Sequence, residues 1–223
     1  MRFASSSAGR SATWVHVALA AQVLAMAALV IFERFEGGRL ARELALFGGD
    51  PRSPGAEAIV RPVTLFAVLV LAVAATTVAA MAAYLLWLRR VLRKVRGGAV
   101  WVWLIPAVNL IAPPFAVHAA WDAAGPPERR RTRWVMLLAS WWISWLTALT
   151  LIVVRLLQHS PRQLTGLGVT ELAVISLAAA LCAATVREIT QLRGIRRAAP
   201  AWPYLTQVRG LRSTARHSYP AGQ

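Results

Sequence analysis

The stretch GGAVWVWLIPAVNLIAPPFAVHAAW, residues 97–121, decides how this chain folds. Its 25 residues carry no formal charge, which makes the stretch long enough to cross a bilayer. Three prolines interrupt it: Pro106, Pro113 and Pro114. Basic clusters flank it on both sides, in residues 89–96 and 128–133. Because basic residues favour the cytoplasmic side, we expect both flanks to lie there and the stretch not to span the membrane.

Composition points to a membrane for the rest of the chain as well. Hydrophobic residues make up 57% of the 223 residues, and the mean hydropathy is +0.53. A soluble domain with these values would expose large apolar patches. The net charge of +16 comes from basic residues that lie between apolar runs. We therefore expect anionic lipid headgroups at the cytoplasmic face, and not nucleic acid, as their partner.

Four uninterrupted apolar runs are long enough for transmembrane helices, since a helix needs about 20 apolar residues to cross the hydrocarbon core. They cover residues 12–32, 62–88, 134–154 and 166–186. The predicted fold is an all-α polytopic membrane protein with four transmembrane helices plus a proline-broken re-entrant or interfacial segment, residues 97–124. The domain plan is a cytoplasmic N-terminus (1–11), a transmembrane domain (12–194) and a basic cytoplasmic tail (195–223). Pro62 is expected in the first turn of the second helix, where its missing N–H costs nothing.

The first run also resembles a secretory signal peptide, because Arg2 and Arg10 precede it and Ala25-Met26-Ala27 offers a small-residue cleavage site. However, its 21 apolar residues exceed the roughly 7 to 15 of a signal peptide, and that cleavage site lies inside them. A transmembrane helix is the favoured interpretation.

The distribution of basic residues predicts the orientation. With both termini cytoplasmic, 18 of the 25 basic residues lie on the inner side and 7 on the outer side. A fifth crossing in residues 97–121 would place two of the four helices the wrong way round. Arginine supplies 24 of the basic residues, which together with the excess of alanine suggests a bacterial genome of high GC content. We expect a multi-pass protein of the bacterial cytoplasmic membrane.

Two short helices are predicted outside the four long runs. The outer connection, residues 33–61, contains an amphipathic pattern in residues 39–47 that ends at a Gly-Gly-Asp-Pro sequence. In the broken stretch, Pro113-Pro114 can only begin a helix and Gly125-Pro126-Pro127 can only end one. A helix of about three turns over residues 115–124 follows, which is half the thickness of a bilayer.

The corner before this half-helix is the main candidate for a site. Asn109 lies just ahead of it, where its amide can satisfy backbone groups that the prolines leave unpaired. If the segment is re-entrant, neighbouring helices must cover Asn109. If it is interfacial, three tryptophans anchor it at headgroup level, namely Trp101, Trp103 and Trp121.

A few polar residues elsewhere are weaker candidates. His118 and Asp122 share one helix face and form either a proton-handling or ion-contacting pair or a pair that faces the headgroups. Glu171 is the only carboxylate inside an apolar run, near the start of its helix, and Arg155 at the same membrane face is expected to pair with it. Small polar points in three helices are expected to meet in the four-helix core: His16, Gln22, Thr76, Thr77, Ser140, Ser144 and Thr147.

No catalytic motif stands in the sequence: no HExxH, GxSxG, Walker loop or GxGxxG. A single cysteine, Cys182, rules out an internal disulfide and a cysteine-rich metal site. We expect no catalytic residue, cofactor or metal, and a non-enzymatic scaffold or regulatory membrane component with a membrane protein partner or a homo-oligomer. The alternative is a small transporter or channel-like protein with a polar path near Asn109, His118 and Glu171.

The pattern Trp103-x-x-Pro106-x-x-Asn109-Leu110, followed by Pro113 and Trp121 and then by Trp141-Trp142-x-x-Trp145, resembles a bacterial membrane family known as domain of unknown function 4328. The similarity extends over roughly residues 62–194. The chain departs from the family pattern at Ile111, where a second aromatic is expected, and at His118-Ala119, where a charged pair is frequent. The resemblance implies the same membrane topology and brings no activity with it.

Overall fold

The computed structural model describes residues 7–47, 56–92, 112–158 and 164–198, and these residues form helices and short connections without a strand. Four long helices dominate: α1 (Ser7–Phe32), α3 (Ala56–Leu92), α6 (Arg131–Leu157) and α7 (Val169–Ala198). Each belongs to a helical run that is long and apolar enough to cross a membrane. The predicted all-α fold with four membrane-spanning helices is confirmed.

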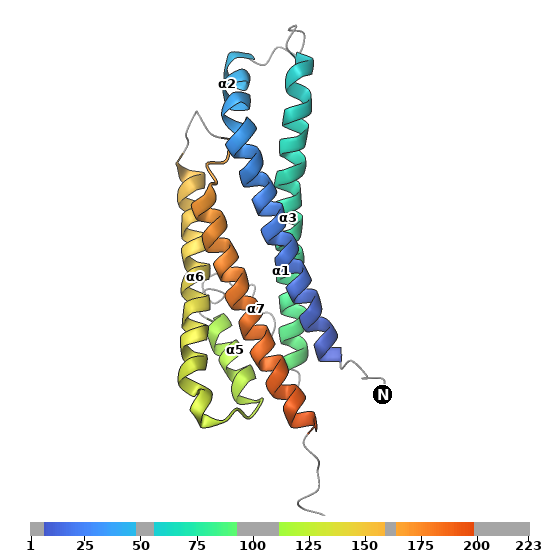
Figure 1. Cartoon of the computed structure of the whole chain (residues 1–223), viewed down its shortest axis with the longest axis vertical. Helices are drawn as coiled ribbons and strands as arrows, with labels where there is room; N and C mark the ends of the chain where they lie inside the picture. The colour runs from blue at the N-terminus through green and yellow to red at the C-terminus, as the bar shows by residue number, and fades with distance from the viewer. Residues whose placement is uncertain (1–6, 48–55, 93–111, 159–163, 199–223) are drawn as a thin grey trace, which may run out of the picture.

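The four long helices form two antiparallel pairs, α1 with α3 and α6 with α7, and α1 joins the pairs by packing on α7 (Figure 1). Successive long helices run in opposite directions. The start of α1, the end of α3, the start of α6 and the end of α7 therefore lie at one end, which we call the terminal end. The opposite end is called the loop end.

The connection after α1 is helical. A π-helical turn, η1 (Glu33–Gly37), leads into α2 (Gly38–Phe47), so the amphipathic helix predicted at residues 39–47 is confirmed. Since α2 continues the direction of α1, the α1–α2 run and α3 rise beyond α6 and α7 at the loop end (Figure 1).

The expectation for Pro62 is wrong, because α3 begins at Ala56 and Pro62 is its seventh residue. Proline lacks the N–H that would reach the carbonyl of Ala58 and normally kinks or ends a helix. The helix continues nonetheless, and the hydroxyl of Thr64 donates to the Val60 carbonyl at 2.8 Å. Residues 56–61 thus extend α3 at its N-terminal end, beyond the apolar run predicted at residues 62–88.

The half-helix predicted at residues 115–124 is present as α5 (Ala112–Asp122), with both prolines in its first turn. It ends before Gly125, whose positive φ of 67° suits a residue without a side chain. Four of its residues are buried against the neighbouring helices: Pro113, Val117, Ala120 and Trp121. α5 thus packs on α3 and α6 inside the terminal half of the bundle.

The core lies at this terminal half. It joins residues from five helices in one cluster, including Val15, Trp87, Val117, Trp134 and Val186, each at most 2% exposed. In lipid, such contacts stabilise by van der Waals packing, because apolar side chains gain little by leaving an apolar solvent. The cluster of buried side chains therefore includes α5 together with parts of all four long helices.

Candidate functional site

The structure describes only part of the motif singled out in the sequence. Trp103, Pro106 and Asn109 lie outside the described residues, as does Trp101. Pro113 and Trp121 are both buried in α5. Trp121 is 2% exposed, so its ring does not face lipid headgroups, where the interfacial alternative would place it. Its ring packs inside the protein because α5 is covered by α3 and α6.

Trp121 is the centre of an aromatic stack. Its ring lies parallel to that of Trp134, with centroids 5.2 Å apart and an interplanar angle of 2°. On α5 itself, the His118 ring stacks against Trp121 at 6.1 Å. The stack ties the half-helix to the first turn of α6.

His118 is fixed by two polar contacts. The indole N–H of Trp134 donates to its Nδ1 at 3.2 Å, and its Nε2 lies 3.4 Å from Oδ2 of Asp122. Because an indole only donates, Nδ1 must accept, which leaves the proton of the neutral ring on Nε2, facing Asp122. The predicted contact between His118 and Asp122 is therefore present, as part of a network that holds α5 to α6.

Glu171 makes the predicted contact with Arg155, whose Nε lies 2.8 Å from Oε1. The carboxylate is 1% exposed, and its second oxygen accepts the backbone N–H of Gly168 at 2.8 Å. This reach back to the residue before the helix is the carboxylate half of a capping box. Glu171 thus fastens the start of α7 to the end of α6 at the loop end.

Glu33 is a second carboxylate at the loop end, and sequence reasoning missed its contacts. One oxygen accepts the backbone N–H groups of Thr165 and Gly166, at 3.0 and 2.9 Å, and the other accepts the Thr165 hydroxyl. These bonds join η1 to the connection before α7, across 132 residues of chain. Nothing in the local sequence around Glu33 signals so distant a partner.

Replacing Glu33 by alanine is expected to lower the free energy of unfolding by about 2 kcal/mol, since two backbone donors lose a charged acceptor. Unfolding in mixed micelles with increasing dodecyl sulfate measures this change. The matched control is Glu43→Ala in α2, whose exposed ion pair with Arg39 is expected to contribute less than about 0.5 kcal/mol. Equal effects of the two replacements would contradict the importance of the Glu33 contacts.

The polar path proposed as the alternative function is not supported by its described members. His118 lies on α5 at the terminal end, whereas Glu171 lies in the first turn of α7 at the loop end. The two side chains therefore lie at opposite ends of the bundle, and within the described residues they share no cavity.

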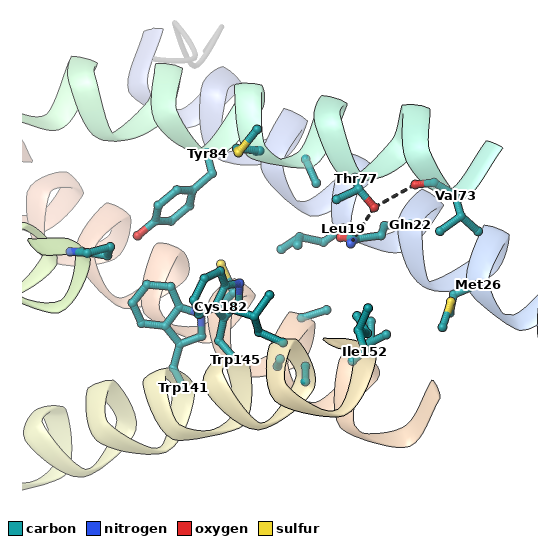
Figure 2. A pocket seen from close by; sticks show the side chains of 18 of the residues that line it. Leu19, Gln22, Met26, Val73, Thr77, Tyr84, Trp141, Trp145, Ile152 and Cys182 are labelled. Atoms are coloured by element: carbon teal, nitrogen blue, oxygen red, sulfur yellow. Dashed lines mark hydrogen bonds between the residues drawn. The ribbon is translucent and has the colours of Figure 1, made fainter. Parts of the chain in front are cut away.

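A cavity of about 1230 Å³ separates α3 from α6 (Figure 2). We call it the α3–α6 groove. Met81 and Leu85 of α3 and Trp145 and Leu149 of α6 line it and are each more than a third exposed, so it opens sideways toward the surrounding lipid. The residues that line it come from five helices and from the connection before α7: Leu19, Gln22, Met26, Val73, Thr77, Ala80, Met81, Tyr84, Leu85, Arg89, Pro113, Trp141, Trp142, Trp145, Ala148, Leu149, Ile152, Leu167, Ile175, Ala178, Ala179 and Cys182.

Few polar groups line the groove. Gln22 of α1 donates to the Thr77 hydroxyl of α3 at 3.2 Å, so two of the polar points predicted to meet do so (Figure 2). His16 instead contacts the Ala183 carbonyl of α7 at 3.2 Å, while Ser140 and Thr147 are exposed. The polar points therefore form separate contacts between helix pairs and not one polar core.

The sequence did not predict the groove or the two polar side chains Tyr84 and Arg89 in its lining. A signal exists for part of the groove, because four lining residues of α3 follow a 4-3-4 spacing and share one helix face: Val73, Thr77, Ala80 and Tyr84. The pattern marks a face of the helix. It does not show that no other helix packs closely on this face, since both lipid and protein can cover an apolar face.

Comparison with known proteins gives one match. Over residues 52–193, the chain matches the family described as Domain of unknown function (DUF4328). The match includes every residue that carries the resemblance found in the sequence, and that prediction is confirmed. No curated protein and no solved structure matches the chain.

Proposed function

This chain belongs to the DUF4328 family, and from that premise we propose that it is a non-enzymatic scaffold or regulatory component of the bacterial cytoplasmic membrane, with both termini in the cytoplasm. In this proposal the terminal end lies in the cytoplasmic leaflet and binds anionic headgroups. A membrane protein partner, or a second copy of the chain, associates with it in the bilayer.

One observation carries the proposal, namely the unequal charge of the two ends. Within the described residues, the terminal end holds eleven arginines and three carboxylates, whereas the loop end holds five of each. The terminal arginines are Arg10, Arg89, Arg90, Arg129, Arg130, Arg131, Arg133, Arg187, Arg193, Arg196 and Arg197. Such an excess of arginine supports a cytoplasmic position for the terminal end. Each arginine near an anionic leaflet contributes about 1 kcal/mol of attraction.

Two carboxylates at the loop end support a structural role. Glu171 is engaged by Arg155 and Gly168, and Glu33 by the backbone of Thr165 and Gly166. All of these bonds join one helix or connection to another. Carboxylates that are engaged in contacts between segments suit a rigid scaffold better than a carrier, which needs them free to bind cargo.

Cysteine accessibility tests the orientation. In a Cys182→Ala background, single cysteines are introduced at six positions: Ser6, Gly49, Gly98, Gly125, Gln163 and Gln223. We expect a membrane-impermeant maleimide to label the cysteines at positions 49 and 163 in intact cells, and the other four only after the membrane is permeabilised. Labelling of positions 98 and 125 from opposite sides would show that the broken segment spans the membrane and would contradict the proposal.

The scaffold role has its own test. Covalent cross-linking in native membranes, followed by purification, is expected to recover one partner, or the chain itself, in a fixed ratio. The matching control is the purified chain in liposomes, where the proposal expects no flux of ions or small solutes above that of empty vesicles. Flux in the absence of a partner would overturn the scaffold in favour of a transporter.

A further inference from the structure

We propose that the α3–α6 groove is a binding site for an anionic glycerophospholipid of the bilayer, with an acyl chain along the groove and the phosphate at Arg89. This inference deepens the proposed function and rests on its orientation, in which the terminal end lies in the cytoplasmic leaflet. It names a specific site, distinct from the diffuse attraction of the basic end as a whole.

The length of the groove suits an acyl chain. Along α3 it runs from Val73 to Arg89, which at 1.5 Å per residue is about 24 Å. One leaflet contributes about 15 Å, half of the hydrocarbon core. A chain that starts at the depth of Arg89 therefore finds apolar walls over its whole length, among them the indole rings of Trp141, Trp142 and Trp145.

The charge of the groove selects an anionic headgroup. Arg89 is the one charged side chain among the described residues that line it, and no carboxylate is among them. It lies three residues before the end of α3, at the terminal end, where a long side chain reaches the headgroups. Guanidinium groups bind phosphate through paired, charge-assisted hydrogen bonds.

Tyr84 supplies an independent sign of a polar ligand atom. Its hydroxyl is buried and has no hydrogen-bond partner in the part of the chain that the structure describes. The side chain projects from α3 toward Trp141, with ring centroids 6.0 Å apart (Figure 2). Tyr84 lies five residues before Arg89, about 7.5 Å deeper along the helix. In this proposal the hydroxyl donates to an ester oxygen of the lipid while the phosphate is at Arg89.

The walls favour a lipid over a transmembrane helix of a partner. Helices pack in membranes through small residues that let their backbones approach. Here three alanines, Ala80, Ala148 and Ala178, are buried, whereas the open rim carries bulky side chains such as Met81 and Trp145. A flexible acyl chain follows such an uneven surface more readily than a rigid helix does.

Native mass spectrometry of the purified full-length chain tests the site, with added phosphatidylglycerol and phosphatidylcholine of identical acyl chains as probes. We expect one tightly retained lipid, with a preference of roughly fivefold for phosphatidylglycerol. Arg89→Gln is expected to abolish most of this preference. Its matched control is Arg90→Gln, which removes the neighbouring charge outside the groove and should leave the preference unchanged. Tyr84→Phe should weaken retention of both lipids.

A second pair of variants blocks the groove without changing charge. Met81→Trp fills the rim and is expected to remove the retained lipid, while Met136→Trp, at a similarly exposed position of α6 outside the groove, should keep it. Equal loss of preference in the two arginine variants would overturn the site and leave the proposed basic end intact. A dimer mass that Met81→Trp abolishes would identify a second copy as the occupant and also overturn it. An inverted cysteine map, by contrast, would count against the proposed orientation.

Discussion

Replacing Trp121 by alanine is expected to lower the free energy of unfolding by about 3 kcal/mol. The ring is 2% exposed and stacks on both His118 and Trp134, so its removal leaves a cavity that a rigid half-helix cannot fill. The loss of van der Waals contacts applies in lipid as it does in water. Unfolding in mixed micelles with increasing dodecyl sulfate measures the change.

The matched control for this prediction is Trp14→Ala. Trp14 lies in α1 and is 67% exposed, so its truncation removes lipid contacts only and should change stability by less than about 0.5 kcal/mol. Trp121→Phe should recover part of the loss, because a smaller ring still stacks on Trp134. If Trp121→Ala and Trp14→Ala were equally mild, α5 would not be the centre of the core.

Replacing Arg155 by methionine is expected to cost about 3 kcal/mol, because it leaves the Glu171 carboxylate buried without its charged partner. The pair is asymmetric: the Glu171 side chain is 1% exposed, whereas that of Arg155 is 42% exposed. Removing Arg155 therefore leaves the buried Glu171 carboxylate without a positive partner. Removing the buried one leaves an arginine that water can still reach.

The variant Glu171→Gln makes this asymmetry measurable. Glutamine keeps an oxygen that can accept the Gly168 N–H, so we expect a smaller loss, about 1 to 2 kcal/mol. The double variant, Arg155→Met with Glu171→Gln, should be more stable than Arg155→Met alone, since the stranded charge is gone. A double variant that is less stable than either single one would show that the ion pair is not what Arg155 contributes.

Several features of the fold follow from local sequence. Hydropathy predicts the four long helices, because no other structure satisfies the backbone of 20 apolar residues in lipid. Amphipathic spacing predicts α2, and the prolines and Gly125 predict α5. Even one tertiary contact, that of Arg155 with Glu171, follows from their shared position at one membrane face.

Other features escape local sequence, because the bilayer is as apolar as the protein interior. An apolar stripe on α3 has the same sequence pattern whether another helix or lipid covers it. The sequence therefore does not predict the α3–α6 groove. Tryptophan is typical of the membrane interface, but Trp121 is buried inside the protein. The partner of Glu33 lies 132 residues away in a connection without a distinctive pattern.

Hydropathy, charge asymmetry and proline placement thus predict the number of helices, their alternation and the half-helix, because each of these depends on how a short segment meets lipid or water. The open groove, the stacked rings around Trp121 and the fastening of the loop end by Glu33 appear only when the helices pack. They depend on contacts between segments far apart in the chain. In a bilayer the faces that contact lipid and the faces that contact protein are both apolar, so the hydrophobic pattern of the sequence does not show which faces pack together.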